Sequence, residues 1–124
     1  MTATTPNVLL NAEAARAMTL TETDPITGLD GAAIGTRDRE LWQSGDGAVT
    51  VGVWEVDAGA FASRFQHYGE CITLVRGELH CTPADGGPAF TVRTGETVVF
   101  PRGWTGEWRT PEGLRKIYTI WSAQ

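Results

Sequence analysis

From residue 39 onward the chain alternates hydrophobic and polar residues in short runs that end at turn-forming residues. Alternation at every second position places side chains on opposite faces of a β-strand. The runs are ELWQS, VTVGVWEV, FASRFQ, ECITLVRG, ELHCTP, AFTVR, ETVVFP, WTGEWR and LRKIYTIW, separated by clusters of Gly, Asp, Pro and Thr. About eight strands spaced by roughly ten residues, with no helix pattern after residue 20, predict an antiparallel sandwich or barrel.

The first 38 residues lack this pattern. The segment from Ala12 to Ala17 favours one short helix, whereas the Thr, Asp, Pro and Gly residues of 19–36 are typical of a loop. We therefore expect an N-terminal arm over residues 1–38 and a barrel domain over residues 39–124. Such an arm can pack on its own sheet or cross to a neighbouring subunit, and the sequence leaves both arrangements open.

The run ECITLVRG, residues 70–77, carries a carboxylate on an apolar face. Glu70, Ile72 and Leu74 share one face of the expected strand. Burying an ionised carboxylate alone costs several kcal/mol, so the group needs a metal, a cation, hydrogen-bond donors or a raised pKa. Glu70 is therefore the first candidate functional residue.

The pair Arg76-Gly77 is typical of a two-residue β-hairpin loop. In that register Ile72 lies opposite Cys81. Cys71 then points to the other face of the sheet, so the two cysteines are expected to be free thiols.

The outward face of the same hairpin is only moderately polar. It would carry Cys71, Thr73, Val75 and His80, with His80 against Thr73. Faces of this kind commonly pair with a second subunit, so we predict a homodimer. An outward His80 is a poor candidate for a site inside the barrel.

Charge and composition exclude some partners. The net charge is −5 and the pI about 4.9, which argues against nucleic acid and anionic membranes because either would require a basic surface. No apolar run has the length of a transmembrane helix or the form of a signal peptide. We expect a cytoplasmic protein.

Two motifs stand within the strand pattern. One is GETVVFPRG, residues 95–103, followed by WTGEW; the other runs from Gly59 through Glu70 to Gly77. They resemble the two motifs of the cupin superfamily, and the resemblance covers about residues 51–121. It implies an all-β, RmlC-like jelly-roll barrel. The run GETVVFPRGWTGEWRT followed by LRKIYTIW is similar, more narrowly, to small single-domain cupins related to ureidoglycine aminohydrolase.

The resemblance also implies a lost metal site. In metal-binding cupins the motifs supply three His and one Glu, a ligand set that suits Mn, Fe, Ni or Zn. The matching positions here hold Arg64, Gln66 and Gly106, and only Glu70 remains. An arginine cannot ligate a cation and a glycine has no side chain. We therefore favour a site without a metal cofactor.

Two arrangements of the remaining groups stay open. A bulge could turn His67 inward, so that Gln66, His67 and Glu70 form a partial site for a divalent metal, although His67 is more simply an exposed loop residue. Alternatively, Arg64 could pair with Glu70 in place of a metal. That pair could equally be a structural ion pair at the barrel mouth.

Aromatic residues follow the second motif. Trp104, Gly106 and Trp108 share a face of the expected strand, so the glycine could open a cavity walled by two indoles. Two inward tryptophans can equally be ordinary core residues.

Lys116 and Tyr118 alternate on the last strand, and the turn before it decides which face they occupy. A four-residue loop would put Ile117 opposite Gly106 and send Lys116 outward. A three-residue loop would put Tyr118 opposite Gly106. We favour an inward Tyr118, because a phenol beside Glu70 would satisfy both groups.

These residues support three hypotheses about function. The first is a small-molecule-binding cupin that holds a small polar metabolite, with Glu70 and Tyr118 as catalytic groups if proton transfer occurs. Its ligand-binding residues would be Arg64, Gln66, Glu70, Trp104, Trp108, Lys116 and Tyr118. The second is a divalent-metal enzyme acting on a small ureido or amino metabolite, as the narrower resemblance implies. The third is a non-catalytic accessory protein.

Overall fold

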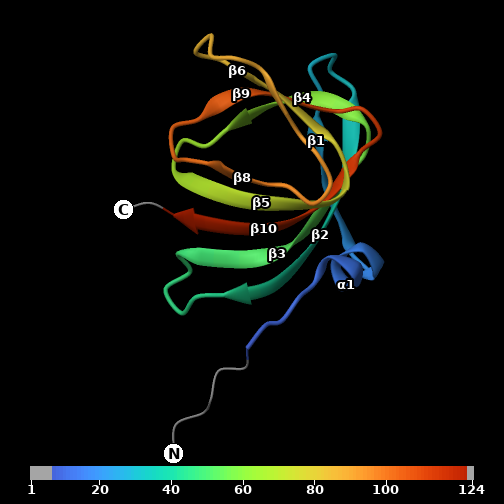
Figure 1. Ribbon diagram of the computed structural model, residues 1–124, viewed down its shortest axis with the longest axis vertical. Coiled ribbons are helices and arrows are strands. Elements are labelled where there is room, and N and C mark those ends of the chain that lie inside the picture. Colours follow the sequence, from blue (N-terminus) through green and yellow to red (C-terminus); the bar gives the residue numbers. More distant parts are fainter. Residues whose placement is uncertain (1–6, 123–124) are drawn as a thin grey trace, which may run out of the picture.

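The computed structural model describes residues 7–122, which form two antiparallel β-sheets facing each other as a barrel (Figure 1). In spatial order, the six-stranded sheet contains β1 (Thr21–Thr27), β2 (Ala33–Gln43), β3 (Val49–Val56), β10 (Leu114–Ser122), β5 (Tyr68–Gly77) and β8 (Thr97–Phe100). The four-stranded sheet contains β4 (Gly59–Arg64), β9 (Thr105–Thr110), β6 (Leu79–Pro83) and β7 (Phe90–Val92). Every run predicted from residue 39 onward contains a strand, and the all-β fold is confirmed.

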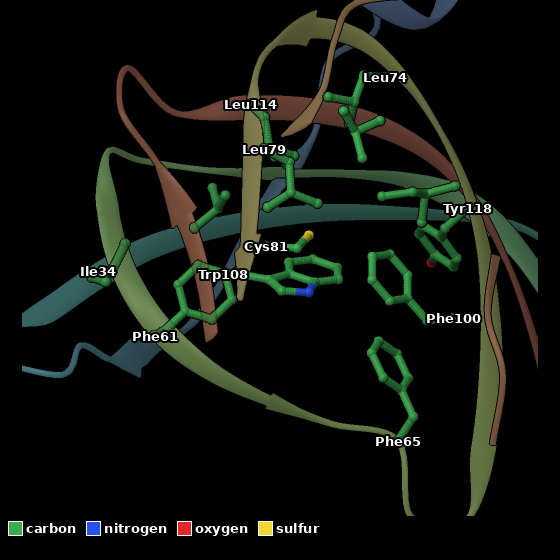
Figure 2. Packing of buried hydrophobic residues seen from close by; sticks show 13 residues of the cluster. Ile34, Phe61, Phe65, Leu74, Leu79, Cys81, Phe100, Trp108, Leu114 and Tyr118 are labelled. Atoms are coloured by element: carbon green, nitrogen blue, oxygen red, sulfur yellow. The ribbon is translucent and has the colours of Figure 1, made fainter. Parts of the chain in front are cut away.

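The hydrophobic core lies between the two sheets, where alternate side chains of each strand point inward (Figure 2). Phe100 is fully buried, Phe65 stacks on it with ring centroids 5.3 Å apart, and the Trp108 ring lies 5.0 Å away. Leu74 and Leu114 close the core at the far side of the same cluster. Each such side chain contributes about 1.5–3 kcal/mol by leaving water.

The N-terminal segment is partly as predicted. Helix α1 (Ala12–Ala17) confirms the expected helix, and the Asn11 carboxamide oxygen accepts from the Ala14 backbone N–H as its N-cap. The expected loop over residues 19–36 is wrong, because β1 and the first part of β2 lie there. The boundary expected between residues 38 and 39 falls inside β2.

The composition of β1 and β2 explains why these strands are hard to recognise. β1 is an edge strand, where Pro25 is tolerated, and its register shifts between Thr23 and Ile26. The buried residue Thr36 of β2 is polar, and its hydroxyl donates to the Asp24 carbonyl oxygen. Neither strand therefore shows a clean alternation of apolar and polar residues.

Helix α1 packs on the outer face of the larger sheet of its own chain (Figure 1). Ala15 is fully buried there, in a cluster with Val53 and Val75. Arg115 fixes the end of the helix, because its Nη1 donates to the carbonyl oxygens of Ala15, Arg16 and Met18 at 2.9, 3.0 and 2.7 Å. A cation at this place complements the C-terminal end of a helix.

The Arg115 guanidinium also belongs to an ion-pair cluster around Glu55. Nε of Arg115 lies 2.9 Å from the Glu55 carboxylate, and Arg37 and Arg76 each approach it to 2.6 Å. Burial alone would raise the pKa of Glu55, but the hydrogen bonds from Arg76, Arg37 and Arg115 outweigh it and lower that pKa to about 2.

The turn at Gly77 does not form the predicted hairpin. β5 pairs with β8 and β10, whereas β6 pairs with β7 and β9. Gly77 has a φ of +85°, and a Cβ there would collide with the Gly113 carbonyl oxygen, so the glycine marks the passage of the chain from one sheet to the other. Cys71 and Cys81 are free thiols, as predicted, and Cys81 is buried.

The surface expected to form a dimer contact is also different. His80 lies opposite Arg109 and Thr91 in the smaller sheet, not against Thr73. Val75 is buried beneath α1. Because these residues lie on two different sheets, they do not form one face, and the homodimer stays a prediction. In the described part of the chain, no helix has the length and apolar character needed to cross a membrane.

Candidate functional site

A pocket of about 640 Å³ lies between the two sheets. Both sheets contribute to its wall, and β1, from the segment expected to be an arm, contributes three side chains. The lining residues are Thr23, Ile26, Thr27, Asp38, Trp54, Phe61, Ala62, Ser63, Arg64, Phe65, Tyr68, Glu70, Trp108, Lys116, Tyr118 and Ile120. Nine of these sixteen residues are aromatic or apolar and seven are polar or charged, and an apolar wall with convergent polar groups is typical of a small-ligand site.

The charged centre of the pocket is an ion pair between Glu70 and Lys116. The Lys116 Nζ donates to Glu70 Oε2 at 2.6 Å, and each side chain is only 6% exposed. Glu70 is therefore buried, as its place on the apolar face of β5 predicted. Its partner is Lys116 on β10 rather than Arg64.

Both Lys116 and Tyr118 point inward, since both are buried and line the pocket. β9 and β10 belong to different sheets. The register alternatives for the preceding turn assumed that these strands pair, and that assumption is wrong. β10 pairs with β3 and β5, and its register against β5 shifts between Arg115 and Lys116. The inward orientation favoured for Tyr118 is confirmed, and the outward alternative for Lys116 is excluded.

Two indoles enclose the Lys116 ammonium group. Nζ lies 4.5 Å from the ring centroid of Trp54 and 4.9 Å from that of Trp108. A cation over an aromatic face is attracted by the ring quadrupole, and more strongly where water is excluded. The amino group is thus held by one carboxylate and two rings.

The Trp108 indole has an unpaired donor. Among the side-chain nitrogen and oxygen atoms that are buried in the described residues, Trp108 Nε1 is the one that lacks a hydrogen-bond partner. Figure 2 shows this nitrogen on the lower edge of the indole, on the side where Phe65, another residue of the pocket wall, lies. Buried polar groups are nearly always paired in folded proteins, so this enclosed donor on a residue of the pocket wall is an exception and a candidate partner for an acceptor atom.

Tyr118 binds Asp38 rather than Glu70. The phenol hydroxyl donates to Asp38 Oδ1 at 2.9 Å. Burial raises the pKa of Tyr118, and the hydrogen bond to Asp38 raises it further, so the hydroxyl keeps its proton at neutral pH. Gly52 lies opposite Tyr118 on β3, and a Cβ at that position would collide with the phenol hydroxyl.

Two of the predicted ligand-binding residues, and the conditional metal ligand His67, lie away from the charged centre. Arg64 lines the pocket but its side chain is exposed. Gln66 and His67 are exposed residues of the segment between β4 and β5 and do not line the pocket. The partial metal site expected from Gln66, His67 and Glu70 is therefore not assembled.

The cavity expected at Gly106 is filled. A Cβ at Gly106 would lie 2.6 Å from the Trp104 ring, so this indole occupies the space that the glycine leaves. Trp104 also packs edge-on against Phe100, with centroids 4.9 Å apart, and is absent from the pocket wall. Of the two predicted indoles, Trp104 is a core residue and Trp108 lines the pocket.

The donor set does not fit a divalent metal. Within residues 7–122, no group of three or more His, Cys, Asp or Glu side chains is arranged to hold one. Glu70, the one ligand that the motif retains, is bound by a cationic ammonium group, which would repel a metal ion. Mn, Fe, Ni or Zn would need imidazole or further carboxylate ligands at this place.

Sequence reasoning missed Trp54, Asp38 and Tyr68, and it missed Lys116 as the partner of Glu70. Trp54 shares the inward face of β3 with Val56, a period-two signal that could have identified it. Asp38 was missed because it belongs to the segment that was expected to be an arm outside the barrel. Lys116 had a compositional signal, because it is the only lysine in a chain with nine arginines.

Residues 43–118 match the family model of the EutQ-like cupin domain, which is more than half of the chain. This chain belongs to the EutQ-like cupin family. The resemblance to the cupin superfamily is thereby confirmed, while the narrower similarity to ureidoglycine aminohydrolase relatives stays a prediction. No curated protein matches this cupin in the comparison made.

Solved structures agree with the cupin fold. A protein of unknown function from Pseudomonas syringae pv. tomato has a TM-score of 0.75 and 24% identity, over 85% of this chain and 45% of that one. The Clostridium difficile EutQ protein has a TM-score of 0.61 and 20% identity, over 73% of this chain and 65% of that one. A putative ethanolamine utilization protein Q from Salmonella typhimurium has a TM-score of 0.59 and 23% identity, over 87% and 99%. At these identities the likeness shows the jelly-roll fold alone, and this cupin spans less than half of the Pseudomonas chain.

Proposed function

We propose that this cupin binds a small, uncharged polar metabolite in the pocket around Lys116 and Glu70, without a metal. The observation that carries the proposal is the buried ion pair, 2.6 Å between Lys116 Nζ and Glu70 Oε2, within an aromatic pocket of about 640 Å³. Where metal-binding relatives of this fold would use a cation to balance the glutamate, this chain uses its own lysine.

The charges of the pocket support an uncharged ligand. Glu70 and Lys116 neutralise each other, and Asp38 holds the phenol of Tyr118. The wall carries two carboxylates, Asp38 and Glu70, and two cationic side chains, Lys116 and Arg64, so its formal charges sum to zero. A neutral ligand suits a pocket without net charge, and it does not compete with either member of the buried Lys116–Glu70 pair.

The polar groups of the wall support a ligand with a carbonyl group. The Trp108 Nε1 donor lacks a partner in the described part of the chain and is enclosed by protein atoms, and a carbonyl oxygen of a ligand would satisfy it once this edge of the indole turns toward the pocket. The phenol oxygen of Tyr118 donates its proton to Asp38, so its lone pairs can accept from an N–H or O–H of the ligand. Small amides, ureido compounds, aldehydes and ketones meet this description.

The ion pair also gives the site a route for proton transfer. Glu70 can accept a proton from a ligand or from Lys116, and Lys116 can return one, because the two groups are in direct hydrogen-bond contact. We propose Glu70 as the general base, with Tyr118, fixed by Asp38, as a neutral hydrogen-bonding group beside it.

Ligand binding tests this proposal. Uncharged carbonyl compounds of the four classes would be screened by thermal shift, and binding would be confirmed by quenching of tryptophan fluorescence. We expect wild-type protein to bind at least one class, and Glu70→Gln and Lys116→Met to lose that binding. Glu78→Gln, which alters an exposed carboxylate, is the matched control and should bind normally. Binding that survives both pocket substitutions would refute the proposed site.

A further inference from the structure

The place of the only lysine in the chain is the starting observation. Nine arginines supply every other strong cation of the sequence, yet the buried partner of Glu70 is Lys116. A planar guanidinium binds a carboxylate through two hydrogen bonds and is less strongly hydrated than an ammonium, so arginine suits a buried ion pair better. A lysine in this position therefore indicates chemistry that a guanidinium cannot perform, and a primary amine, unlike a guanidinium, is a nucleophile.

We propose that Lys116 captures an aldehyde or ketone as a protonated Schiff base, with Glu70 moving the protons. This inference rests on the proposed function, because it specifies the carbonyl ligand of the same pocket. Lys116 lines the pocket, so its buried Nζ can meet a ligand there while remaining out of bulk water.

The step balances with the groups present. Glu70 takes one proton from the Lys116 ammonium, and the resulting amine attacks the carbonyl carbon to form a C–N bond. The carbonyl oxygen takes up a proton, the amine nitrogen loses one, and a neutral carbinolamine results. The carbinolamine hydroxyl then takes the proton held by Glu70 and leaves as water, giving an iminium ion and the Glu70 carboxylate. Ammonium and carbonyl compound become iminium and water, with no oxidant or reductant.

The surroundings of Nζ suit this product. The iminium carries the same single positive charge as the ammonium, so it keeps the attraction to Glu70 at 2.6 Å and to the indole faces at 4.5 and 4.9 Å. Only the transient neutral species, the amine and the carbinolamine, lose these interactions.

Reductive trapping tests the inference on the unmodified protein. The full chain would be treated separately with benzaldehyde, propanal and acetone in the presence of sodium cyanoborohydride, which reduces an iminium to a stable secondary amine. Because Lys116 is the only lysine of the sequence, peptide mass mapping separates its adduct from any on the terminal amine of the chain. The same reactions in guanidinium chloride give the rate for an unfolded lysine.

We expect at least one probe to label Lys116 ten-fold faster in the native protein than in the unfolded chain. Glu70→Gln, which keeps the lysine, should remove this advantage, while Glu78→Gln should keep it. Native labelling that is slower than, or equal to, unfolded labelling with all three probes would overturn the inference.

Binding of benzamide, which forms no Schiff base, separates the two proposals. If benzamide binds and Lys116 is not labelled, the proposal that the pocket binds an uncharged carbonyl compound is supported and the proposal of a Schiff base at Lys116 is wrong. If no carbonyl compound binds and none labels Lys116, both are overturned.

Discussion

Replacing both members of the buried ion pair should cost less stability than replacing either one. The Lys116 and Glu70 side chains are each 6% exposed and their charged atoms lie 2.6 Å apart, so water cannot solvate the charge that remains when its partner is removed. Leaving one buried charge uncompensated costs about 3–5 kcal/mol, whereas replacing a buried pair by apolar residues of similar volume is near neutral or stabilising by about 1–4 kcal/mol. We expect Lys116→Met and Glu70→Leu each to lose about 3–5 kcal/mol. The double variant should lie within about 1 kcal/mol of the wild type, or above it.

Guanidinium unfolding, followed by far-ultraviolet circular dichroism, measures these free energies. Tryptophan fluorescence is a poorer probe, because Trp54 and Trp108 contact the substituted group directly. Equal slopes against denaturant would show that the variants unfold from the same compact state. If the two single losses instead add in the double variant to within about 0.5 kcal/mol, the residues are not coupled and the reasoning fails.

Three further predictions concern the rest of the molecule. The folded pKa of Glu55 is depressed from 4.5 to about 2, so the stabilisation it contributes is present above pH 4.5 and is lost as the pH falls toward 2. The free energy of unfolding, measured at a series of pH values, should fall by up to about 3 kcal/mol across this window. Glu55→Gln should abolish that part of the pH dependence. Arg115→Met removes the donor to two carbonyl oxygens of α1 and to that of its C-cap residue Met18, and should cost about 1.5–3 kcal/mol, with faster hydrogen exchange across residues 12–18. Arg109→Met, on the other sheet, should leave that exchange unchanged, and equal protection in both variants would refute the role of Arg115. Light scattering during size-exclusion chromatography should report the mass of a homodimer, because the edge strand β8 exposes an apolar side chain to a second subunit: Val99, opposite Cys71, is 54% exposed. A monomer mass at all concentrations would contradict this prediction.

Much of the fold could be predicted because each strand from β3 onward carries its own alternation. Glu70 is the clearest case: its shared face with Ile72 and Leu74 predicted both its burial and its need for a partner. The pairing between strands could not be predicted in the same way. Gly77 gives the local signal of a hairpin, but a positive φ serves equally well where the chain leaves one sheet for the other. Because the chain leaves the larger sheet at Gly77, β5 pairs with β10 and not with β6, and this pairing brings Lys116 to Glu70.

The polar wall of the pocket was harder to predict for a related reason. Asp38 and Thr23 point into the pocket from strands whose inward faces mix polar residues with Ile26 and Ile34, so neither strand shows the alternation by which a strand is recognised. Trp104 and Trp108 look alike in sequence, two positions on either side of Gly106, yet one fills the core and the other lines the pocket. Only the packing of the two sheets decides between them.

Metal content tests most directly the claim that Lys116 takes the place of a metal beside Glu70. Untagged protein, purified without a chelator, would be measured by elemental mass spectrometry together with Glu70→Gln. The account predicts Mn, Fe, Ni and Zn far below one atom per chain in both proteins. Near-stoichiometric metal in the wild type that disappears in Glu70→Gln would contradict it.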